Sequence, residues 1–538
     1  MNFWFSIAVL TQRLSSFCCI ALVTLIASCG GGGGGDTSTD ASLSPNITSP
    51  VITLNGDSAI NLFIGDSYIE QGATAIDDLD GEVNVIISGS VDTSTVNNYV
   101  ITYSATDSAG NTGNLTREVN VILPPGAFVT IWKTDNPGTS SSDQIQITTL
   151  GAGYDYRIEW GDGSADNNVT GNIVHSYEAA GTYTLIITGD FPRIFFGQDL
   201  GLHDSKKLLS LEQWGNQQWQ SMNFALSFCS NLQINATDTP DLSQTTDMSF
   251  MFAGASSFNQ DLSGWDVSTI TNMSGMFATA SNFDQDLSGW DVSAVTGMSG
   301  MFIYANAFNQ DLSDWDVSAV NDMSSMFNGA IAFNQDLSGW DVSAVTDKDS
   351  MFFGVSAFNQ DLSDWDVSAV TDMGSMFLGV SAFNQDLSGW DVSAVTDLDR
   401  MFNGARAFNQ DLSGWDVSAV TDMGGMFSSA RVFNQDLSDW DVSAVTDMGN
   451  MFNDARAFDQ DLSRWDISSV TDMTNMFNGI TLLTTHYDSL LLSWSQQNVY
   501  SDLEFHGGDS TYSSSSQDAR DMLSNDYGWI ITDGGVAP

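Results

Sequence analysis

Aspartate is the side chain in this sequence with the greatest capacity for chemistry, and it recurs at a fixed spacing. Paired carboxylates cleave glycosidic bonds by acid–base catalysis, and rows of carboxylates bind divalent cations. They also accept hydrogen bonds from backbone N–H groups where a turn or helix begins. Three series repeat every 25 residues: Asp261 to Asp461, Asp266 to Asp466, and a less regular one with Asn272, Gly297 and then Asp322 to Asp472.

The repetition of these aspartates argues against catalysis. An active site is normally a single arrangement, whereas these pairs occur in every copy. The sequence has four histidines, none of them in an HExxH spacing, and it has no Gly-x-Ser-x-Gly motif. We therefore expect a protein that is not an enzyme, with turn capping favoured over cation binding for the three series. A polysaccharide-acting enzyme that uses Asp pairs is the least favoured alternative.

A separate group of aspartates lies nearer the N-terminus. Asp77, Asp78 and Asp80 are close in sequence, and Asp107 follows the next predicted strand. If they meet at one end of a β-sandwich they could hold calcium, which takes several carboxylate and carbonyl oxygens. The spacing is not that of an EF-hand loop, and aspartates that cap their own turns are the favoured alternative. Calcium is the one cofactor that the sequence suggests.

The positions that vary between copies are the candidates for ligand binding. Arg406, Arg431 and Arg456 are 25 residues apart, and Tyr304 and Phe353 vary in the same short stretch. On stacked copies the three arginines would form a basic stripe on a very acidic body. The stripe either contacts an acidic ligand or partner, or it forms salt bridges with nearby aspartates, each of which contributes little.

The elements that carry these residues repeat. The phrase AFNQDLSGWDVSAVTD at 332–347 recurs with little change in nine copies, and the tryptophans from Trp265 to Trp465 are spaced by 25 residues throughout. Such a period indicates stacked units that share one core. Apolar residues three and four apart in 320–330 predict a short helix, and the alternation in 333–337 predicts a short strand. Strands of successive coils would pair in parallel, about 4.8 Å apart.

These copies, with MF seven residues before FNQ, resemble the 25-residue leucine-rich repeats of BspA-like surface proteins over residues 208–480. The resemblance implies a cell-surface protein, and some members of that family are associated with adhesion. Residues 201–250 contain a degenerate copy that is expected to cap the nine repeats of 251–480. Residues 481–538 resemble the closing segment of the same family, and end coils need such caps to cover core and strand edges.

Two further units precede the repeats. Residues 48–123 alternate like a small β-sandwich, and phrases such as YVITYSATDSAGNTGNLTREVNV resemble a bacterial surface Ig-like domain. Residues 124–200 contain WGDG, HSY and GTY, which resemble the polycystic-kidney-disease-type (PKD-like) β-sandwich. The predicted fold class is therefore two all-β sandwiches followed by an α/β leucine-rich-repeat-like solenoid with one short parallel strand and one short helix per coil.

The N-terminus has the features of an export signal. Residues 1–28 are predicted to be a signal peptide, because the apolar run 20–26 is too short for a stable bilayer anchor. IASC, ending at Cys29, resembles a lipobox and implies lipidation of Cys29, with Gly30 next in a pattern that resembles outer-membrane sorting. The glycine-rich residues 29–47 form the predicted tether. Of the four cysteines, Cys229 alone would remain in the exported domains, as a core residue.

These observations predict a non-enzymatic cell-surface lipoprotein whose solenoid binds a protein or glycan ligand. The formal net charge of −53, from 67 acidic and 14 basic residues, excludes nucleic acid as a partner and restricts membrane contact to the lipid. We expect a bacterial envelope location, at the outer membrane. The alternative is a calcium-dependent structural protein of the envelope or matrix.

Overall fold

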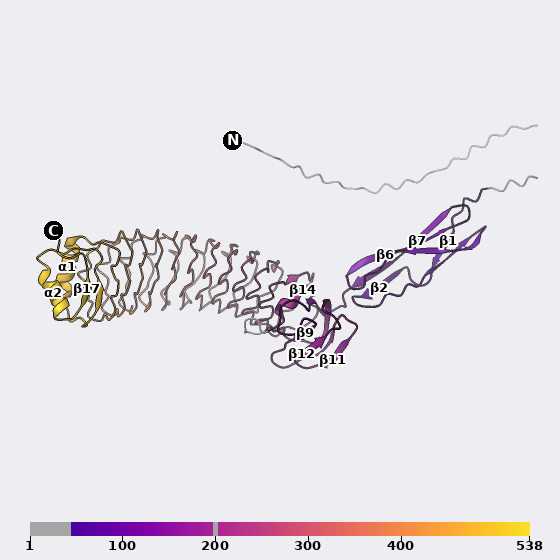
Figure 1. Ribbon diagram of the computed structural model, residues 1–538, viewed down its shortest axis with the longest axis horizontal. Helices are drawn as coiled ribbons and strands as arrows, with labels where there is room; N and C mark the ends of the chain where they lie inside the picture. Colours follow the sequence, from indigo (N-terminus) through magenta and orange to yellow (C-terminus); the bar gives the residue numbers. More distant parts are fainter. Residues whose placement is uncertain (1–44, 197–202) are drawn as a thin grey trace, which may run out of the picture.

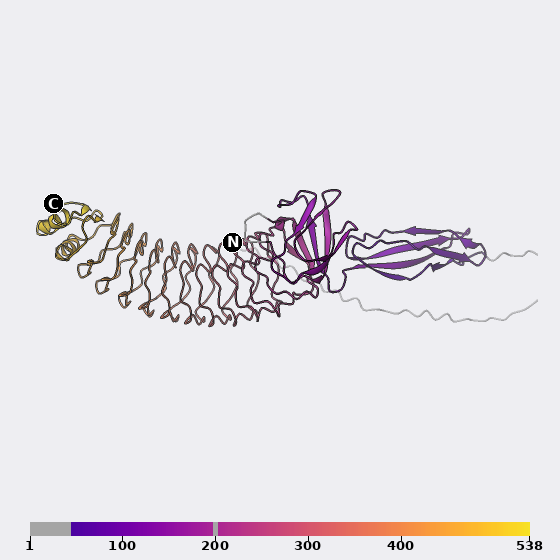
Figure 2. The same ribbon diagram turned by 90° about the horizontal axis from the view of Figure 1, so that it is seen from below.

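The computed structural model describes residues 45–196 and 203–538. The chain is elongated (Figure 1): an Ig-like unit at one end is followed by a second β unit, a long solenoid and a closing segment with two helices. Viewed at 90° to this, the solenoid bends as an arc (Figure 2). Among the described residues, none of the helices has the length and apolar character needed to cross a membrane. The signal peptide, Cys29 and most of the predicted tether lie outside the described residues.

The first unit is a sandwich of two sheets. Alternation along its strands buries one face of each sheet, and Ile101, Tyr103 and Val119 form the centre of the core. One sheet has the order β1-β3-β4 and the other the order β2-β7-β6-β5. The bounds are β1 Val51–Leu54, β2 Ala59–Phe63, β3 Ala73–Asp77, β4 Gly81–Val83, β5 Val85–Ser88, β6 Asn97–Thr106 and β7 Thr112–Ile122.

A buried ion pair closes one side of this sandwich. The side chain of Arg117 is fully buried, and its Nη1 donates to Glu70 Oε1 at 2.9 Å. The same nitrogen donates to the Tyr103 hydroxyl, while Nε and Nη2 donate to the carbonyls of Asp57 and Asn55. Because each of its three nitrogens has an acceptor, this buried charge is satisfied rather than orphaned.

The second β unit continues into the start of the solenoid. Its larger sheet has the order β11-β10-β13-β8-β14-β15, and β14 and β15 lie beyond the boundary that the sequence suggests at residue 200. One hydrophobic cluster runs from Phe128 in this unit to Trp529 near the C-terminus. The unit and the solenoid are therefore joined by one sheet and one core. The bounds are β8 Phe128–Lys133, β9 Gln144–Ile147, β10 Asp155–Glu159, β11 Ala165–Val169, β12 Ile173–Ser176, β13 Thr182–Asp190, the 3₁₀ turn η1 Ser205–Lys207, β14 Leu208–Gln213 and β15 Gln233–Ile234.

The helix predicted for each coil is wrong. In the coil at 320–330, Ser325 donates its N–H to the carbonyl of Asp349 on the next coil (2.7 Å), whereas Met326 donates to Met323 within its own coil (3.1 Å). Ser325 and Gly329 have φ of 55° and 70°. Left-handed residues four apart give a succession of tight turns, because an α-helix needs right-handed residues and bonds to the carbonyl four back. The apolar spacing of three and four comes from these turns.

The strand predicted at 333–337 is also wrong, although successive coils do pair in parallel. The pairing is a single bridge per coil in the third aspartate series, such as Asp322 with Asp347. At 333–337 the coils are joined by side chains instead: Asn309 Oδ1 accepts the backbone N–H of Asn334 and the Nε2 of Gln335, both at 2.9 Å. The predicted strand residues therefore form an amide ladder without a β-sheet.

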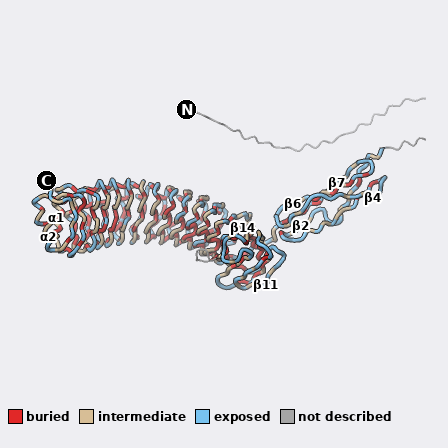
Figure 3. Tube along the Cα trace, in the orientation of Figure 1, coloured by how far each residue is buried: buried red, intermediate tan, exposed pale blue. Residues whose placement is uncertain are grey.

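Columns of aromatic and apolar side chains fill the solenoid. Phe277 and Phe302 stack on successive coils with ring centroids 5.6 Å apart, and Phe302 stacks on Phe308 of its own coil at 3.9 Å. The Trp340 indole N–H donates to the Leu312 carbonyl at 2.9 Å, which satisfies its polar atom in the core. Buried residues accordingly recur along every coil (Figure 3).

The closing segment continues the coil-to-coil bonding and then covers the last coil. Phe477 donates its N–H to the carbonyl of His506, and Met473 forms a parallel bridge with Phe505. Trp494 lies against Phe505 with centroids 5.7 Å apart. The bounds are α1 Thr484–Trp494, β16 Glu504–His506, α2 Gln517–Asn525 and β17 Ile530–Thr532.

Candidate functional site

The first two aspartate series cap turns. Asp386 Oδ1 accepts the N–H of Ser388 at 2.9 Å, and Asp391 Oδ1 accepts that of Ser393 at 3.1 Å. Hydrogen bonds from Ser388 and Ser393 hold the pKa of Asp386 and Asp391 below their ordinary values. These contacts are local and recur along the solenoid, so they match the favoured turn-capping interpretation.

The third series differs, because its carboxylates are partly buried beside one another. A Cβ placed on Gly424 would lie 3.1 Å from Asp422 Oδ1, 3.2 Å from Asp399 Oδ1 and 3.3 Å from Asp447 Oδ1. Burial raises the pKa of Asp447 in this series, and it raises the pKa of Asp399, two residues after the series member on its coil, to about 6 even though Arg400 lies 3.4 Å away. The sequence pattern did not separate this series from the other two.

The basic stripe is exposed on consecutive coils. Arg406, Arg431 and Arg456 are all exposed. Arg456 Nε lies 2.7 Å from Asp454 Oδ1, and Arg431 Nη2 lies 3.4 Å from Asp454 Oδ2. Ion pairing within the chain therefore engages two of the arginines through a single aspartate. For Arg406, no ion pair is found among the described residues.

Tyr304 and Phe353 lie in different columns from the stripe and on earlier coils, four and two coils before that of Arg406. The side chain of Tyr304 is 49% exposed, and its ring covers Gly329 of the next coil so closely that a Cβ there would lie 2.3 Å from the ring. Phe353 is half-buried. We use the name variable ridge for Tyr304, Phe353, Arg406, Arg431 and Arg456, which the structure places along one edge of the coils.

The N-terminal aspartates do meet at the end of the Ig-like unit. Asp77, Asp80 and Asp107 each offer a carboxylate oxygen, and these oxygens lie within 4.8 Å of one another. Asp78 is instead bonded to the Thr48 hydroxyl at 2.6 Å. The Oδ1 of Asp77 accepts the N–H groups of Leu79 and Asp80, so turn capping and ion binding are not exclusive here.

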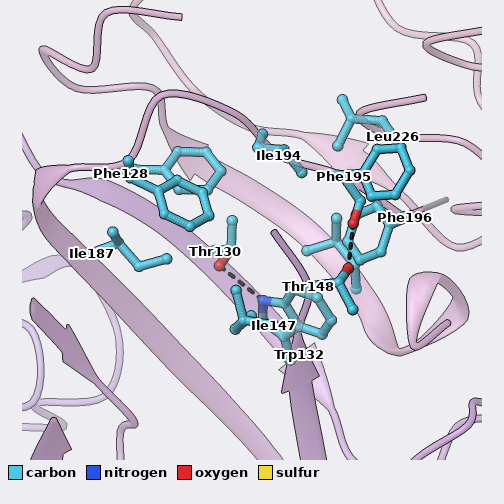
Figure 4. Close-up of a pocket in the computed structure, with 12 residues that line it drawn as sticks. Phe128, Thr130, Trp132, Ile147, Thr148, Ile187, Ile194, Phe195, Phe196 and Leu226 are labelled. Carbon is cyan, nitrogen blue, oxygen red and sulfur yellow. Dashed lines mark hydrogen bonds between the residues drawn. The ribbon is translucent and has the colours of Figure 1, made fainter. Parts of the chain in front are cut away.

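The most apolar cavity is too small for a ligand. It lies between the second β unit and the first coil, and Trp132, Ile147, Phe196 and Leu226 are among the side chains around it (Figure 4). Its volume is about 20 Å³, and about 15 Å³ is already needed for one water molecule. A polar cleft of about 510 Å³ lies where the Ig-like and second β units meet. The ion pair of Arg157 with Glu159 on its wall is exposed to solvent, so this pair does not mark a buried ligand site.

One buried ionisable residue escaped the sequence reasoning. Lys348 stands where the neighbouring coils have Met323 and Met373, and it is fully buried. Its Nζ has no hydrogen-bond partner among the described residues and lies 5.8 Å from the centre of the Trp365 ring. The sequence signal that could have identified this residue is a lysine at a position where the neighbouring coils have methionine.

The fold and these sites define a modular protein: β-sandwich units that carry a solenoid of 25-residue turns. Residues 220–340, 310–412 and 381–490 match the family described as "Mycoplasma protein of unknown function, DUF285". Together the matches span residues 220–490, half of the 538-residue chain. The chain belongs to this family. The more specific likeness to BspA-like leucine-rich repeats stays a prediction.

Residues 52–121 match the family described as "Bacterial surface protein, Ig-like domain", which confirms the Ig-like prediction for the first unit. The likeness of the second unit to a PKD-like sandwich stays a prediction. A search of the curated proteins found no match. Among solved structures, the lipoprotein BT2262 from Bacteroides thetaiotaomicron is 20% identical over 27% of this chain and 62% of that chain. Its TM-score of 0.13 is too low to carry an argument.

Proposed function

We propose that this chain is a non-catalytic bacterial cell-surface lipoprotein, held to the envelope through lipid on Cys29, whose variable ridge binds an acidic protein or glycan. The observation that carries the proposal is a contrast within the coils. Core columns keep nearly the same residues in every copy, whereas the ridge changes from small residues to Tyr304, Phe353 and three arginines. Stacking of the coils requires the constant core columns, but it does not require the variation along the ridge.

The charge of the ridge supports an acidic ligand. The chain has a formal net charge of −53, yet its ridge places Arg406, Arg431 and Arg456 on consecutive coils, where Asp454 pairs with the last two. An arginine fork binds carboxylate or sulfate oxygens in pairs. Exposed aromatic rings beside arginines are typical of binding surfaces. The match of residues 52–121 to a bacterial surface domain supports the location.

Binding of the full-length chain to arrays of matrix proteins and sulfated or carboxylated glycans tests this proposal. The test variant replaces Arg406, Arg431 and Arg456 with serine. The matched control replaces Lys133, Arg157 and Arg464, three exposed cations away from the ridge, and changes the net charge equally. Loss of a selective interaction in the first variant alone supports the ridge. Equal loss in both variants, or no binding at all, contradicts it and favours a structural envelope role.

A further inference from the structure

The tip of the Ig-like unit carries three converging carboxylates without a cationic partner. Oxygens of Asp77, Asp80 and Asp107 lie within 4.8 Å of one another, and no ion pair from Lys or Arg to any of them is found among the described residues. The same unit does balance another carboxylate, because the partly exposed Glu70 is paired with the fully buried Arg117 at 2.9 Å. The charge at the tip therefore lacks the compensation that the sandwich provides elsewhere.

One oxygen in this cluster is buried and unused. Asp77 is 3% exposed, and its Oδ2 is buried with no hydrogen-bond partner among the described residues. Its Oδ1 already accepts the N–H groups of Leu79 and Asp80 at 2.9 Å each, so the orientation of the carboxyl group is fixed. A buried carboxylate oxygen without a partner is costly, and a bound cation is one of the few groups that can satisfy it.

Hydrogen bonds also fix the positions of the other two carboxylates, Asp107 and Asp80. Asp107, only 7% exposed, accepts hydrogen bonds from the backbone and side chain of Asn111 at 2.7 Å each. Asp80 is exposed, and the backbone and hydroxyl of Ser108 donate to its two oxygens. Asp77 is the last residue of β3, Asp80 lies in the turn that follows it, and Asp107 directly follows β6.

The segment that enters the sandwich is tied to the same cluster. Asn46 Nδ2 donates to Asp107 Oδ2 at 3.0 Å, and Asn111 Nδ2 donates to the Asn46 carbonyl at 3.1 Å. The Thr48 hydroxyl donates to Asp78 at 2.6 Å. An ion among the three carboxylates would therefore act on the point where the chain leading from the N-terminus meets the folded protein.

We infer that Asp77, Asp80 and Asp107 bind one calcium ion, which fastens residues 46–48 to the tip of the Ig-like unit. An all-oxygen set suits calcium, which accepts six to eight oxygens in variable geometry. Magnesium requires a near-ideal octahedron and keeps its water. Zinc favours nitrogen and sulfur ligands, and this cluster has neither. With part of the shell supplied by water, an affinity of about 10⁻⁴ to 10⁻³ M is expected, as in other extracellular modules.

Amide hydrogen exchange on the full-length chain tests the site independently of ligand binding by the solenoid. We expect 2 mM calcium chloride to slow exchange at Leu79, Asp80 and Asn111, the amides bonded to the cluster, by about 3- to 20-fold, since occupancy closes local opening. Magnesium chloride at the same concentration serves as the ion control. Because the acidic solenoid also attracts cations, protection is read only from peptides that cover 77–80 and 107–111.

Asp77→Asn is the test variant, because the amide keeps Oδ1 for the turn and removes the charged Oδ2. Asp92→Asn is the matched control: Asp92 Oδ1 also accepts the N–H two residues on, from Ser94 at 2.9 Å, but it lies outside the cluster. We expect protection to be lost in the first variant and kept in the second. Unchanged protection of β6 and β7 without calcium shows that the variant folds, and Asp80→Asn, at an exposed position, gives a second test.

Three outcomes would overturn this inference. They are the absence of calcium-dependent protection in the unmodified chain up to 10 mM, protection that persists in both Asp77→Asn and Asp80→Asn, and equal protection by magnesium.

Discussion

Lys348 gives the sharpest test of the solenoid core. It is fully buried in a column that neighbouring coils fill with methionine, and its Nζ has no hydrogen-bond partner among the described residues. The Trp365 ring lies 5.8 Å from this nitrogen, and the charge of Asp366 is too weak a compensation. Burial lowers the pKa of Lys348 to about 7 from an ordinary value of 10.5. Replacement by methionine should therefore stabilise the solenoid.

The size of this effect depends on pH in a defined direction. Between pH 7 and pH 10.5 the unfolded chain holds a proton on Lys348 that the folded chain releases, so stability rises with pH across this window. Below pH 7 the full penalty is present, and a pKa lowered by about 3.5 pH units corresponds to about 5 kcal/mol. At pH 6 this penalty adds to the cost of burying an unpaired amine, so Lys348→Met should raise the free energy of unfolding by about 6 kcal/mol. At pH 10.5 the gain should fall to about 1–2 kcal/mol, the cost of an unpaired neutral amine.

Urea unfolding followed by tryptophan fluorescence at several pH values measures this difference, since the repeated tryptophans report on the solenoid. Lys133→Met is the matched control, because Lys133 is 44% exposed and the substitution removes the same charge. Its curve should parallel that of the unmodified chain. If the stabilities of Lys348→Met and the unmodified chain also run parallel from pH 6 to pH 10, the amine is solvated or paired and the reasoning is refuted.

Three further predictions concern single coils, each measured by the same unfolding assay. Burial raises the pKa of Asp399 to about 6, so stability should fall as pH rises from about 4 to about 6, and Asp399→Gly, the residue of neighbouring coils, should flatten that fall. Gly354 has φ of 73° with open space around a Cβ, so Gly354→Ala should cost about 1 kcal/mol, while Ser325→Gly at φ 55° should gain a similar amount. Trp340→Phe removes the indole N–H, one of two donors to the Leu312 carbonyl, which also accepts the Trp315 N–H at 3.1 Å, and should cost about 0.5–1.5 kcal/mol, whereas an unchanged midpoint would mean that water replaces the indole.

The stacking and the core columns could be predicted from the sequence because they follow from the period alone. A 25-residue repeat of Phe, Leu, Trp, Val and Met has to place like residues on one another. The local backbone could not be predicted from apolar spacing, because Met323, Met326 and Phe327 have the same spacing in a helix and in successive tight turns. The distinguishing signal was the glycine that recurs in the column of Gly329, where φ is positive.

For the sites as well, the sequence indicated which residues lie near one another but not how deeply each side chain is buried. The sequence grouped Asp77, Asp80 and Asp107 correctly as a meeting point, since turns at one end of a sandwich are neighbours. It could not show that Asp77 Oδ2 is buried and unused, because the burial of a single oxygen depends on how distant segments pack around it. For the same reason, the raised pKa of Asp399 depends first on its burial and then on nearby charges that include carboxylates of the following coils.

The architecture also explains why the ridge can change while the coil cannot. Each coil contacts the one before and the one after, so a core substitution disturbs two interfaces. A ridge residue such as Arg431 projects from the edge and contacts little besides Asp454. Nine coils at about 4.8 Å each give an edge of about 43 Å, long enough for an extended ligand. Because the second β unit shares its sheet and core with the solenoid, residues along this edge can vary without changing how the edge is presented, which is what the proposed binding function requires.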